Sequence, residues 1–287
     1  MKEGVSVVIP VFNEENAILS TIEEVDQILT KSAVPYEIVV VNDGSTDQTE
    51  QKLKNLGANI KLYSHAVNRG YGASLKTGIR QTYFDIIAIT DADSTYPNEM
   101  IPKMYQELEG YNMVVGQRAF KKLPFFTRPA KWFITKLANY LAEYEIPDIN
   151  SGLRVFRKDD AMKFFHIFPS GFSFTTTITL AMLTNDMNVK YVPINYMKRE
   201  GKSKIRPLYD TMNFIQLIVR TIMYFNPLKV FIPLFFILLL AALAVFLYSY
   251  FFLERILDVS TAILFISSIQ VLAIGMLADL IDKRIYK

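Results

Sequence analysis

The chain has 287 residues, 51% of them hydrophobic, and a formal net charge of +3. That charge is too small to indicate a nucleic-acid partner, so none is expected. The sequence contains no cysteine, which excludes a disulfide framework and a thiolate metal site. The apolar run that ends at Pro10 is too short for the hydrophobic core of a signal peptide with its cleavage site, so we expect the N-terminal part not to be secreted.

The first 120 residues alternate between strand-like and helix-like patterns. Short runs rich in Val, Ile and Tyr predict strands at residues 5–9, 37–41, 60–63, 86–90 and 113–116. Helical patterns lie between them, for example at residues 15–31 and 46–56. This alternation predicts an α/β fold with a mainly parallel sheet and helices on both faces. In such sheets, ligands bind at the carboxyl ends of the strands.

Polar motifs follow the first two strands. Each of them, residues 10–15 (PVFNEE) and 42–47 (NDGSTD), could be a strand–turn–helix junction, with Asn13, Ser45 or Thr46 capping a helix. Read together, they place two carboxylates at one edge of the sheet, where a carboxylate can bind a base or a ribose. The two carboxylates are those of Glu14 and Asp43.

A glycine-rich segment, residues 68–73 (NRGYGA), follows the third strand. It lacks the third glycine of a dinucleotide fingerprint, so that function is excluded. Two interpretations stay open from the pattern alone. The backbone of the segment approaches a phosphate, or the segment is only a loop.

Two carboxylates, Asp91 and Asp93, follow the fourth strand. Carboxylates spaced in this way can hold one hard divalent cation, and Mg²⁺ prefers few carboxylates together with waters and substrate phosphates. A nucleoside diphosphate would supply those phosphates, and the metal would stabilise the leaving group. A single D-x-D is also common in solvated loops. The preceding apolar run and the neighbouring motifs favour the metal.

The C-terminal part contains two apolar runs, residues 231–253 and 261–281. Each approaches the ~20 residues that span a bilayer, which favours a transmembrane hairpin over two buried core helices. By the positive-inside rule, the flanking charges predict that both termini and the whole part of the chain before these runs lie in the cytoplasm, as in a multi-pass protein of the cell membrane. These charges are Lys202, Lys204, Arg206, Arg220 and Lys229 before the runs, and Lys283, Arg284 and Lys287 after them. Residues 207–226 have helical apolar spacing, typical either of a helix in the headgroup layer or of one packed on the core of the N-terminal α/β part.

The order of these motifs resembles family 2 glycosyltransferases of GT-A fold. That resemblance rests on residues 8–14 (VIPVFNE), 41–47 (VNDGSTD) and 91–93 (DAD). Later motifs resemble the dolichol-phosphate mannose synthase-like branch of polyprenyl-phosphate glycosyltransferases. They are residues 115–118 (VGQR), 148–154 (DINSGLR), 171–174 (GFSF), 199–204 (REGKSK) and 226–229 (NPLK).

The resemblance implies an organisation and an activity. Residues 1–206 would form the catalytic domain, residues 207–228 amphipathic juxtamembrane helices, and residues 229–287 the transmembrane hairpin. The enzyme would transfer one sugar from a UDP- or GDP-hexose to a polyprenyl phosphate at the cytoplasmic face of the membrane, with inversion and with Mg²⁺ or Mn²⁺. A homo-oligomer formed through the hairpins is a further expectation.

The resemblance also implies roles for individual residues. The nucleotide site would comprise Pro10, Phe12, Asn13, Glu14, Asp43, Gly44, Asp91 and Ala92. Asp91 and Asp93 would bind the metal, and Asp93, Arg118 and Arg154 would be catalytic. The acceptor or diphosphate site would comprise Arg118, Ser151, Arg154, Lys202 and Lys204. Guanidinium groups suit phosphate; surface ion pairs for the arginines, and attraction to the membrane surface for the lysines, are the simpler alternatives.

The chain departs from its relatives at two places. Residues 175–177 are three threonines where many relatives carry an acid, and residues 94–97 (STYP) replace a Gln-containing stretch. The third metal ligand is therefore open, with Thr95 or a water as candidates. Two other functions stay in view, a processive polysaccharide synthase of the same fold and a catalytically silent membrane protein that binds nucleotide sugars. Against the former, Trp132 lies outside the Gln-x-x-Arg-Trp motif of those synthases.

Overall fold

The computed structural model describes residues 2–55, 57, 59–119, 136–140, 142–171, 173–197, 207–253 and 258–285. It divides into two compact units, Met1–Phe214 and Ile215–Lys287, and each is described by itself. The finer domain boundaries expected after residues 206 and 228 stay predictions.

A seven-stranded sheet forms the centre of the first unit, with strand order β3-β2-β1-β4-β6-β5-β7. The strands are β1 (Val5–Val11), β2 (Tyr36–Asn42), β3 (Ile60–Ser64), β4 (Ile86–Ile89), β5 (Met113–Arg118), β6 (Arg154–Arg157) and β7 (Val189–Ile194). Only β6 is antiparallel to its neighbours, so the expected mainly parallel sheet is confirmed. All seven residues of β1 are buried, which explains its unbroken apolar sequence, because both faces of a parallel sheet are covered.

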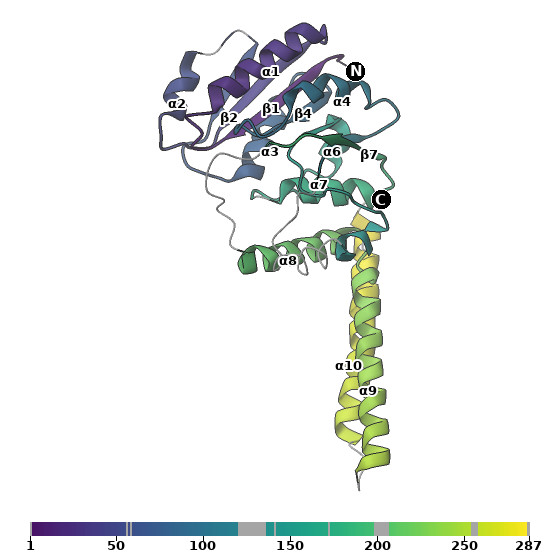
Figure 1. Cartoon of the computed structure of the whole chain (residues 1–287). Helices are drawn as coiled ribbons and strands as arrows, with labels where there is room; N and C mark the ends of the chain where they lie inside the picture. Colours follow the sequence, from purple (N-terminus) through teal and green to yellow (C-terminus); the bar gives the residue numbers. More distant parts are fainter. Residues whose placement is uncertain are drawn as a thin grey trace. The chain divides into compact units, whose positions relative to one another are not determined.

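Helices cover both faces of this sheet, as predicted (Figure 1). They are α1 (Ile18–Ser32), α2 (Thr49–Lys52), α3 (Tyr71–Gln81), α4 (Ile101–Gln106), α6 (Lys158–Lys163) and α7 (Phe174–Leu183), with short 3-10 turns at Leu53–Asn55 and Asn98–Met100. On one face, α1 and α4 share a core with the odd-numbered residues of β1. On the other, α3 packs so closely that a Cβ on Gly78 would overlap Val8.

The strand directions bring several loops to one edge of the sheet. The carboxyl ends of β1, β2, β4 and β5 lie there because these strands run parallel to one another. The antiparallel β6 begins at this edge, and its first residue, Arg154, pairs with Ile89 of β4 and with Val115 of β5. The loop before β6 therefore meets the D-x-D turn that follows β4.

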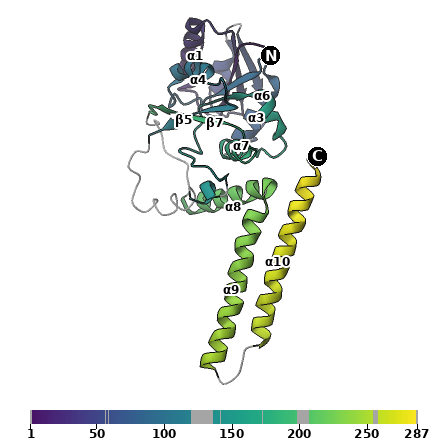
Figure 2. The same ribbon diagram turned by 90° about the vertical axis from the view of Figure 1, so that its right-hand side faces the viewer.

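The second unit contains two long apolar helices, α9 (Leu228–Phe252) and α10 (Asp258–Ile285), which pack side by side (Figure 2). Both are long and apolar enough to cross a membrane by length and composition. Their contact is close, since a Cβ on Gly275 would lie 2.5 Å from the Cβ of Phe231. A further helix, α8 (Pro207–Phe225), crosses the division between the units; Ile218 and Ile222 lie on its buried face. Its place in the headgroup layer stays a prediction.

Candidate active site

The loops after β1 and β2 are joined to each other by hydrogen bonds. The Asn13 side chain accepts from the backbone N–H of Thr46 at 2.8 Å, and the backbone N–H of Asn13 donates to Ser45 Oγ at 3.1 Å. These residues cap no helix, because the N-cap positions of α1 and α2 are Ala17 and Gln48. The helix-cap interpretation of Asn13, Ser45 and Thr46 is therefore wrong. The other predicted nucleotide residues of this edge, Pro10, Phe12, Glu14 and Gly44, lie on the same two strand ends.

The Asp43 carboxylate, which is buried, anchors the segment after β3. Its oxygens lie 2.7 Å from Nδ1 of His65 and accept the backbone N–H groups of Arg69 and Gly70 at 2.9 and 2.8 Å. The other ring nitrogen of His65 lies 2.9 Å from the Thr77 hydroxyl. Asp43 thus fixes the 65–70 loop, a role that its position at the strand end did not reveal. Contact between Asp43 and a nucleoside stays a prediction.

The glycine-rich segment docks against the segment before α7. The backbone N–H groups of Gly72 and Ala73 donate to the carbonyls of Gly171 and Ser170 at 3.1 and 2.9 Å. A Cβ on Gly72 would overlap the carbonyl of Pro169, so only glycine allows this approach. The N–H groups of Arg69 and Gly70 donate to Asp43, so the backbone of this segment joins the end of β2 to the segment before α7. This geometry favours a packing loop over a phosphate cradle.

Asp91 and Asp93 form the predicted carboxylate pair. Asp91 accepts from the Tyr71 hydroxyl at 3.0 Å, and Asp93 accepts from the Thr95 hydroxyl at 2.6 Å. Burial, reinforced by the negative charge of Asp91, raises the pKa of Tyr71 well above its usual value, so Tyr71 stays a neutral donor. A Cβ on Gly152 would lie 2.8 Å from Oδ2 of Asp91, so this glycine leaves room above the carboxylate.

The donor set fits a hard divalent cation. Within the described residues, no group of three or more His, Cys, Asp or Glu side chains forms a complete protein cage. Asp91 and Asp93 offer two carboxylates on one short turn, the number that Mg²⁺ takes when substrate phosphates and waters complete its shell. Thr95, the candidate third ligand, is buried and uses its hydroxyl hydrogen for Asp93.

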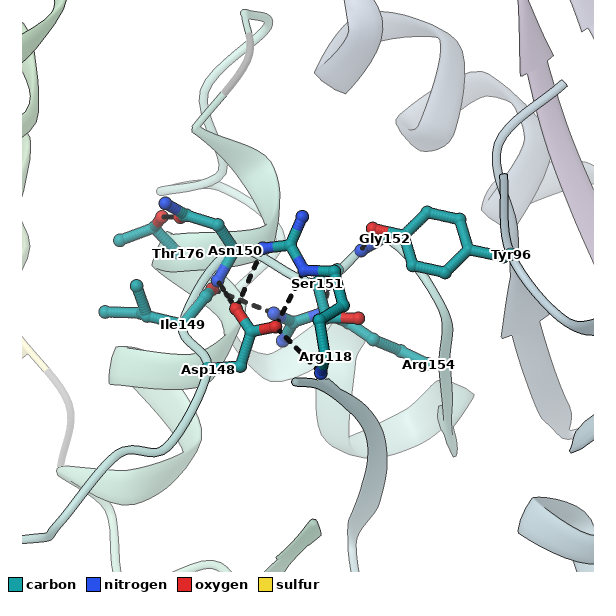
Figure 3. A network of polar contacts seen from close by, with 9 residues as sticks. All are labelled: Tyr96, Arg118, Asp148, Ile149, Asn150, Ser151, Gly152, Arg154 and Thr176. Carbon is teal, nitrogen blue, oxygen red and sulfur yellow. Dashed lines mark hydrogen bonds and ion pairs between the residues drawn. The ribbon is translucent and has the colours of Figure 1, made fainter. Parts of the chain in front are cut away.

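Arg118, the last residue of β5, forms a bidentate ion pair with Asp148 (Figure 3). Nε and Nη2 of Arg118 lie 2.7 and 2.9 Å from the two carboxylate oxygens. Burial disfavours the Asp148 carboxylate, but the hydrogen bonds and charge of Arg118 outweigh that cost and hold the pKa of Asp148 below its usual value. The guanidinium also lies 5.4 Å from the ring centroid of Tyr196. The pair holds Arg118 at the same edge as Asp91.

Arg154 lies beneath the loop at residues 148–152 and supports it from inside (Figure 3). Its side chain is fully buried, with Nε 2.7 Å from the Ser151 carbonyl and Nη2 2.9 Å from the Ile149 carbonyl. Nη1 donates to the Thr179 hydroxyl at 2.5 Å. The family resemblance implies that Arg154 faces a phosphate. In the structure, its N–H groups donate to Ser151, Ile149 and Thr179 inside the protein. This geometry favours a role in positioning the loop at residues 148–152 over direct contact with a phosphate.

The same loop contains residues that the sequence did not single out for the site. The backbone N–H of Gly152 donates to the Tyr96 hydroxyl at 2.6 Å, and Asn150 accepts from the Thr176 hydroxyl at 2.6 Å. Ser151, a predicted acceptor ligand, has a buried hydroxyl with no hydrogen-bond partner among the described residues. Asp148 belongs to the motif at residues 148–154. Its ion pair with Arg118 could not be predicted, because 30 residues separate the two in the sequence.

Two of the predicted phosphate ligands, Lys202 and Lys204, lie outside the described residues. The threonines where relatives carry an acid, residues 175–177, are all buried in the first turn of α7. The Thr177 hydroxyl donates to the carbonyl of Ser173 at 3.0 Å. No carboxylate therefore occupies these three positions to serve as a base.

Curated relatives match about seven tenths of this chain, and the share of each relative's own length that is covered differs between them. A dolichyl-phosphate hexose transferase from Haloferax volcanii is 30% identical over 209 residues, covering 71% of this chain and 88% of that protein. An undecaprenyl-phosphate 4-deoxy-4-formamido-L-arabinose transferase from Yersinia enterocolitica is 29% identical over 219 residues, covering 74% and 64%. Both names describe the transfer of a sugar to or from a polyprenyl phosphate.

The fold also matches solved structures. Glucosyl-3-phosphoglycerate synthase from Mycobacterium tuberculosis, in complex with Mn²⁺, UDP and phosphoglyceric acid, superposes with a TM-score of 0.62 at 20% identity, covering 77% of this chain and 78% of that one. At this identity the likeness shows the fold alone. The family models for glycosyl transferase family 2 and for the GtrB C-terminal hairpin match residues 6–165 and 226–283. These matches confirm the resemblance read from the motifs: the chain belongs to glycosyltransferase family 2 and carries a GtrB-type C-terminal hairpin.

Proposed function

We propose that the enzyme transfers one hexose from a UDP- or GDP-hexose to a polyprenyl phosphate, with inversion and with Mg²⁺ or Mn²⁺. One observation carries this proposal. A carboxylate pair suited to a metal, Asp91 and Asp93, and an arginine held in fixed orientation, Arg118, meet at one edge of the sheet. The names of the relatives, which describe dolichyl- and undecaprenyl-phosphate transferases, support the acceptor class.

Asp91 and Asp93 would hold the cation. Mn²⁺ and Mg²⁺ accompany UDP in structures of the mycobacterial synthase, which supports a divalent metal here. When bound, such a cation neutralises charge on the departing diphosphate. Tyr71 and Thr95 donate hydrogen bonds to the two carboxylates and thereby orient them.

The acceptor chemistry explains why no base is needed. A sugar hydroxyl must lose a proton as it attacks, which requires a positioned base. A phosphate monoester has a second pKa of about 6 and is already a nucleophilic anion at neutral pH. Its oxygen forms the new bond to the anomeric carbon as the bond to the diphosphate breaks, which inverts that carbon. The buried threonines 175–177 fit this mechanism.

Arg118 would then position the acceptor. Asp148 takes the hydrogen of Nε and one hydrogen of Nη2, which leaves the edge of the planar guanidinium formed by Nη1 and the second Nη2 hydrogen for a phosphate. Arg154 would act indirectly, because its bonds to the Ser151 and Ile149 carbonyls fix the loop that carries Gly152 over Asp91. Lys202 and Lys204 remain proposed phosphate ligands on the strength of the family resemblance.

The two long apolar helices of the hairpin support a reaction at a membrane. We place both termini and the catalytic unit on the cytoplasmic side, because basic residues flank the outer ends of α9 and α10. Single-cysteine labelling of whole cells tests this arrangement, since the natural chain has no cysteine. A cysteine at Asp258 should react with an impermeant reagent, and one at Lys2 should react only after lysis. Labelling of both positions from outside would contradict the topology.

The decisive experiment measures transfer from radiolabelled nucleotide sugars to a short-chain prenyl phosphate, beside the matching prenyl alcohol. We expect one labelled sugar in an organic-extractable product with the phosphate and almost none with the alcohol. Efficient transfer to the alcohol would contradict the proposed acceptor. A long polymer would indicate a processive synthase. Nucleotide-sugar binding without product, over a full panel of donors, would indicate a silent binding protein.

A further inference from the structure

His65, one of two histidines in the chain, lies beside Asp43 at the end of two neighbouring strands. Asn42 of β2 pairs with Ser64 of β3, and Asp43 and His65 are the next residues along the two chain segments. The Nδ1 atom of His65 lies 2.7 Å from the Asp43 carboxylate, and the two side chains are only 7% and 4% exposed. His65 belongs to none of the recognised motifs, and the proposed transfer step gives it no role.

Both ring nitrogens of His65 have a partner. An ionised carboxylate only accepts hydrogen bonds, so Nδ1 carries the hydrogen that Asp43 accepts. In the neutral ring Nε2 is then an acceptor, and the Thr77 hydroxyl, 2.9 Å away, donates to it. Thr77 lies on α3, which packs tightly on the sheet at the next residue, Gly78. The imidazole is therefore held from both sides and keeps one orientation toward Asp43.

This orientation determines which part of the Asp43 carboxylate is left for a ligand. A carboxylate has about four lone-pair positions for hydrogen bonds. Oδ1 accepts from Nδ1 of His65 and from the N–H of Arg69, and Oδ2 accepts from the N–H of Gly70. In the part of the chain that the structure describes, these are the three donors to this carboxylate. One position, on Oδ2, is left.

We infer that His65 is a positioning residue of the donor site, which orients Asp43 so that Oδ2 accepts one N–H or O–H group of the nucleoside. This role rests on the proposed function, because it requires that Asp43 contacts the nucleoside of the donor. A group that is already fixed in its bound orientation loses less freedom when the ligand binds, so affinity rises. Loss of His65 therefore weakens the contact with the nucleoside but not the contact of Asp91 and Asp93 with a cation and diphosphate.

Binding measurements on the full chain in detergent test this role. The ligands are UDP, GDP and inorganic diphosphate, each with Mn²⁺, followed by titration calorimetry. His65→Ala should weaken binding of the nucleoside diphosphate about tenfold, the order of one hydrogen bond to a charged group, and should leave inorganic diphosphate within about twofold. Thr82→Val is the matched control, since it removes a buried hydroxyl at the other end of α3 and should change neither. Unchanged nucleotide binding in His65→Ala, or equal weakening of both ligands, would overturn the inference.

Two amide substitutions identify the ring nitrogen that matters, and they decide the question alone if His65→Ala does not fold. Asparagine places its amide nitrogen close to the position of Nδ1, whereas the longer glutamine places it close to that of Nε2. His65→Asn should therefore retain most of the nucleotide affinity, and His65→Gln should resemble His65→Ala. Equal affinities in the two variants, or the reverse order, would contradict the positioning of Asp43 through Nδ1.

Kinetics add an independent readout, because a change in ground-state binding of the donor should appear in its KM and leave kcat nearly unchanged. A loss that falls in kcat alone would contradict a positioning role in donor binding. The binding assays need no turnover. A natural chain that shows the expected binding pattern but forms no product would therefore contradict the proposed transfer and still support the role of His65.

Discussion

Replacing Arg118 with alanine should slow transfer to prenyl phosphate by about two orders of magnitude. The guanidinium has five N–H donors, of which Asp148 takes one on Nε and one on Nη2. Hydrogen bonds to charged groups contribute about 1.5–3 kcal/mol each, so two of the remaining donors on a phosphate could contribute roughly 3 kcal/mol or more. At about 1.4 kcal/mol per factor of ten, the loss of 3 kcal/mol corresponds to about 10²-fold in kcat/KM.

The alanine variant also leaves Asp148 buried without its ion partner. Breaking a buried pair in this way costs about 3–5 kcal/mol of folding free energy, and less here because the Arg118 side chain is 28% exposed. The double variant Arg118→Ala/Asp148→Ala separates the two effects. It removes the stranded carboxylate, so its Tm should recover relative to the single variant, while transfer stays slow.

The assay is transfer kinetics on both variants in detergent, with thermal unfolding of the same samples. Thr177→Ala is the control, because the hydroxyl that it removes only bonds a backbone carbonyl, and its rate should change little. Nucleotide binding should survive in all three variants. If the double variant recovers transfer together with stability, Arg118 serves only to neutralise Asp148, and the proposed acceptor contact is refuted.

Three further predictions concern the metal turn and the loop above it. Excess EDTA should abolish transfer, and Asp93→Asn should nearly do so without a large change in Tm; full activity in EDTA would refute the metal assignment. Gly152→Ala places a Cβ 2.8 Å from Oδ2 of Asp91, so it should raise the Mn²⁺ concentration needed for half-maximal activity about tenfold or more. An unchanged metal titration would argue against a role for Asp91. Arg154→Met removes the hydrogen-bond donors to the Thr179 hydroxyl, to the buried Ser151 carbonyl and to the part-buried Ile149 carbonyl, and it should lower the free energy of unfolding by about 3 kcal/mol. Denaturant titration would show this loss, and an unchanged midpoint would contradict it.

The sequence predicts those strands whose own residues show a clear apolar pattern. Runs such as residues 37–41 are buried on both faces and hold almost only Val and Ile, which identifies β2 without tertiary information. The four residues of β6 are too few for a pattern, and two of them are arginines. Its antiparallel pairing with β4 and β5 is decided by neighbours that are distant in the sequence.

In the candidate site, too, some residues could be located from the sequence and others could not. The carboxylates of Asp91 and Asp93 follow a predictable strand, so their location could be deduced from the sequence. The burial of Arg154 could not, because charged side chains are almost never fully buried without a partner, and its partners include Thr179, 25 residues along the chain. Likewise, the anchoring role of Asp43 depends on backbone N–H groups of Arg69 and Gly70, which carry no sequence signal.

The occupied amides around the start of α3 have a consequence for the energetics of the donor. Many nucleotide-binding folds hold a diphosphate with the free N–H groups of a helix N-terminus, an attraction that is built in permanently. Here Asp43 takes the N–H groups of residues 69 and 70, and the carbonyls of residues 171 and 170 take those of residues 72 and 73. These four N–H groups are thus bonded to acceptors within the protein and do not hold a diphosphate. Donor affinity should therefore follow the concentration of free divalent cation, so that ionic conditions set how long the nucleotide stays bound.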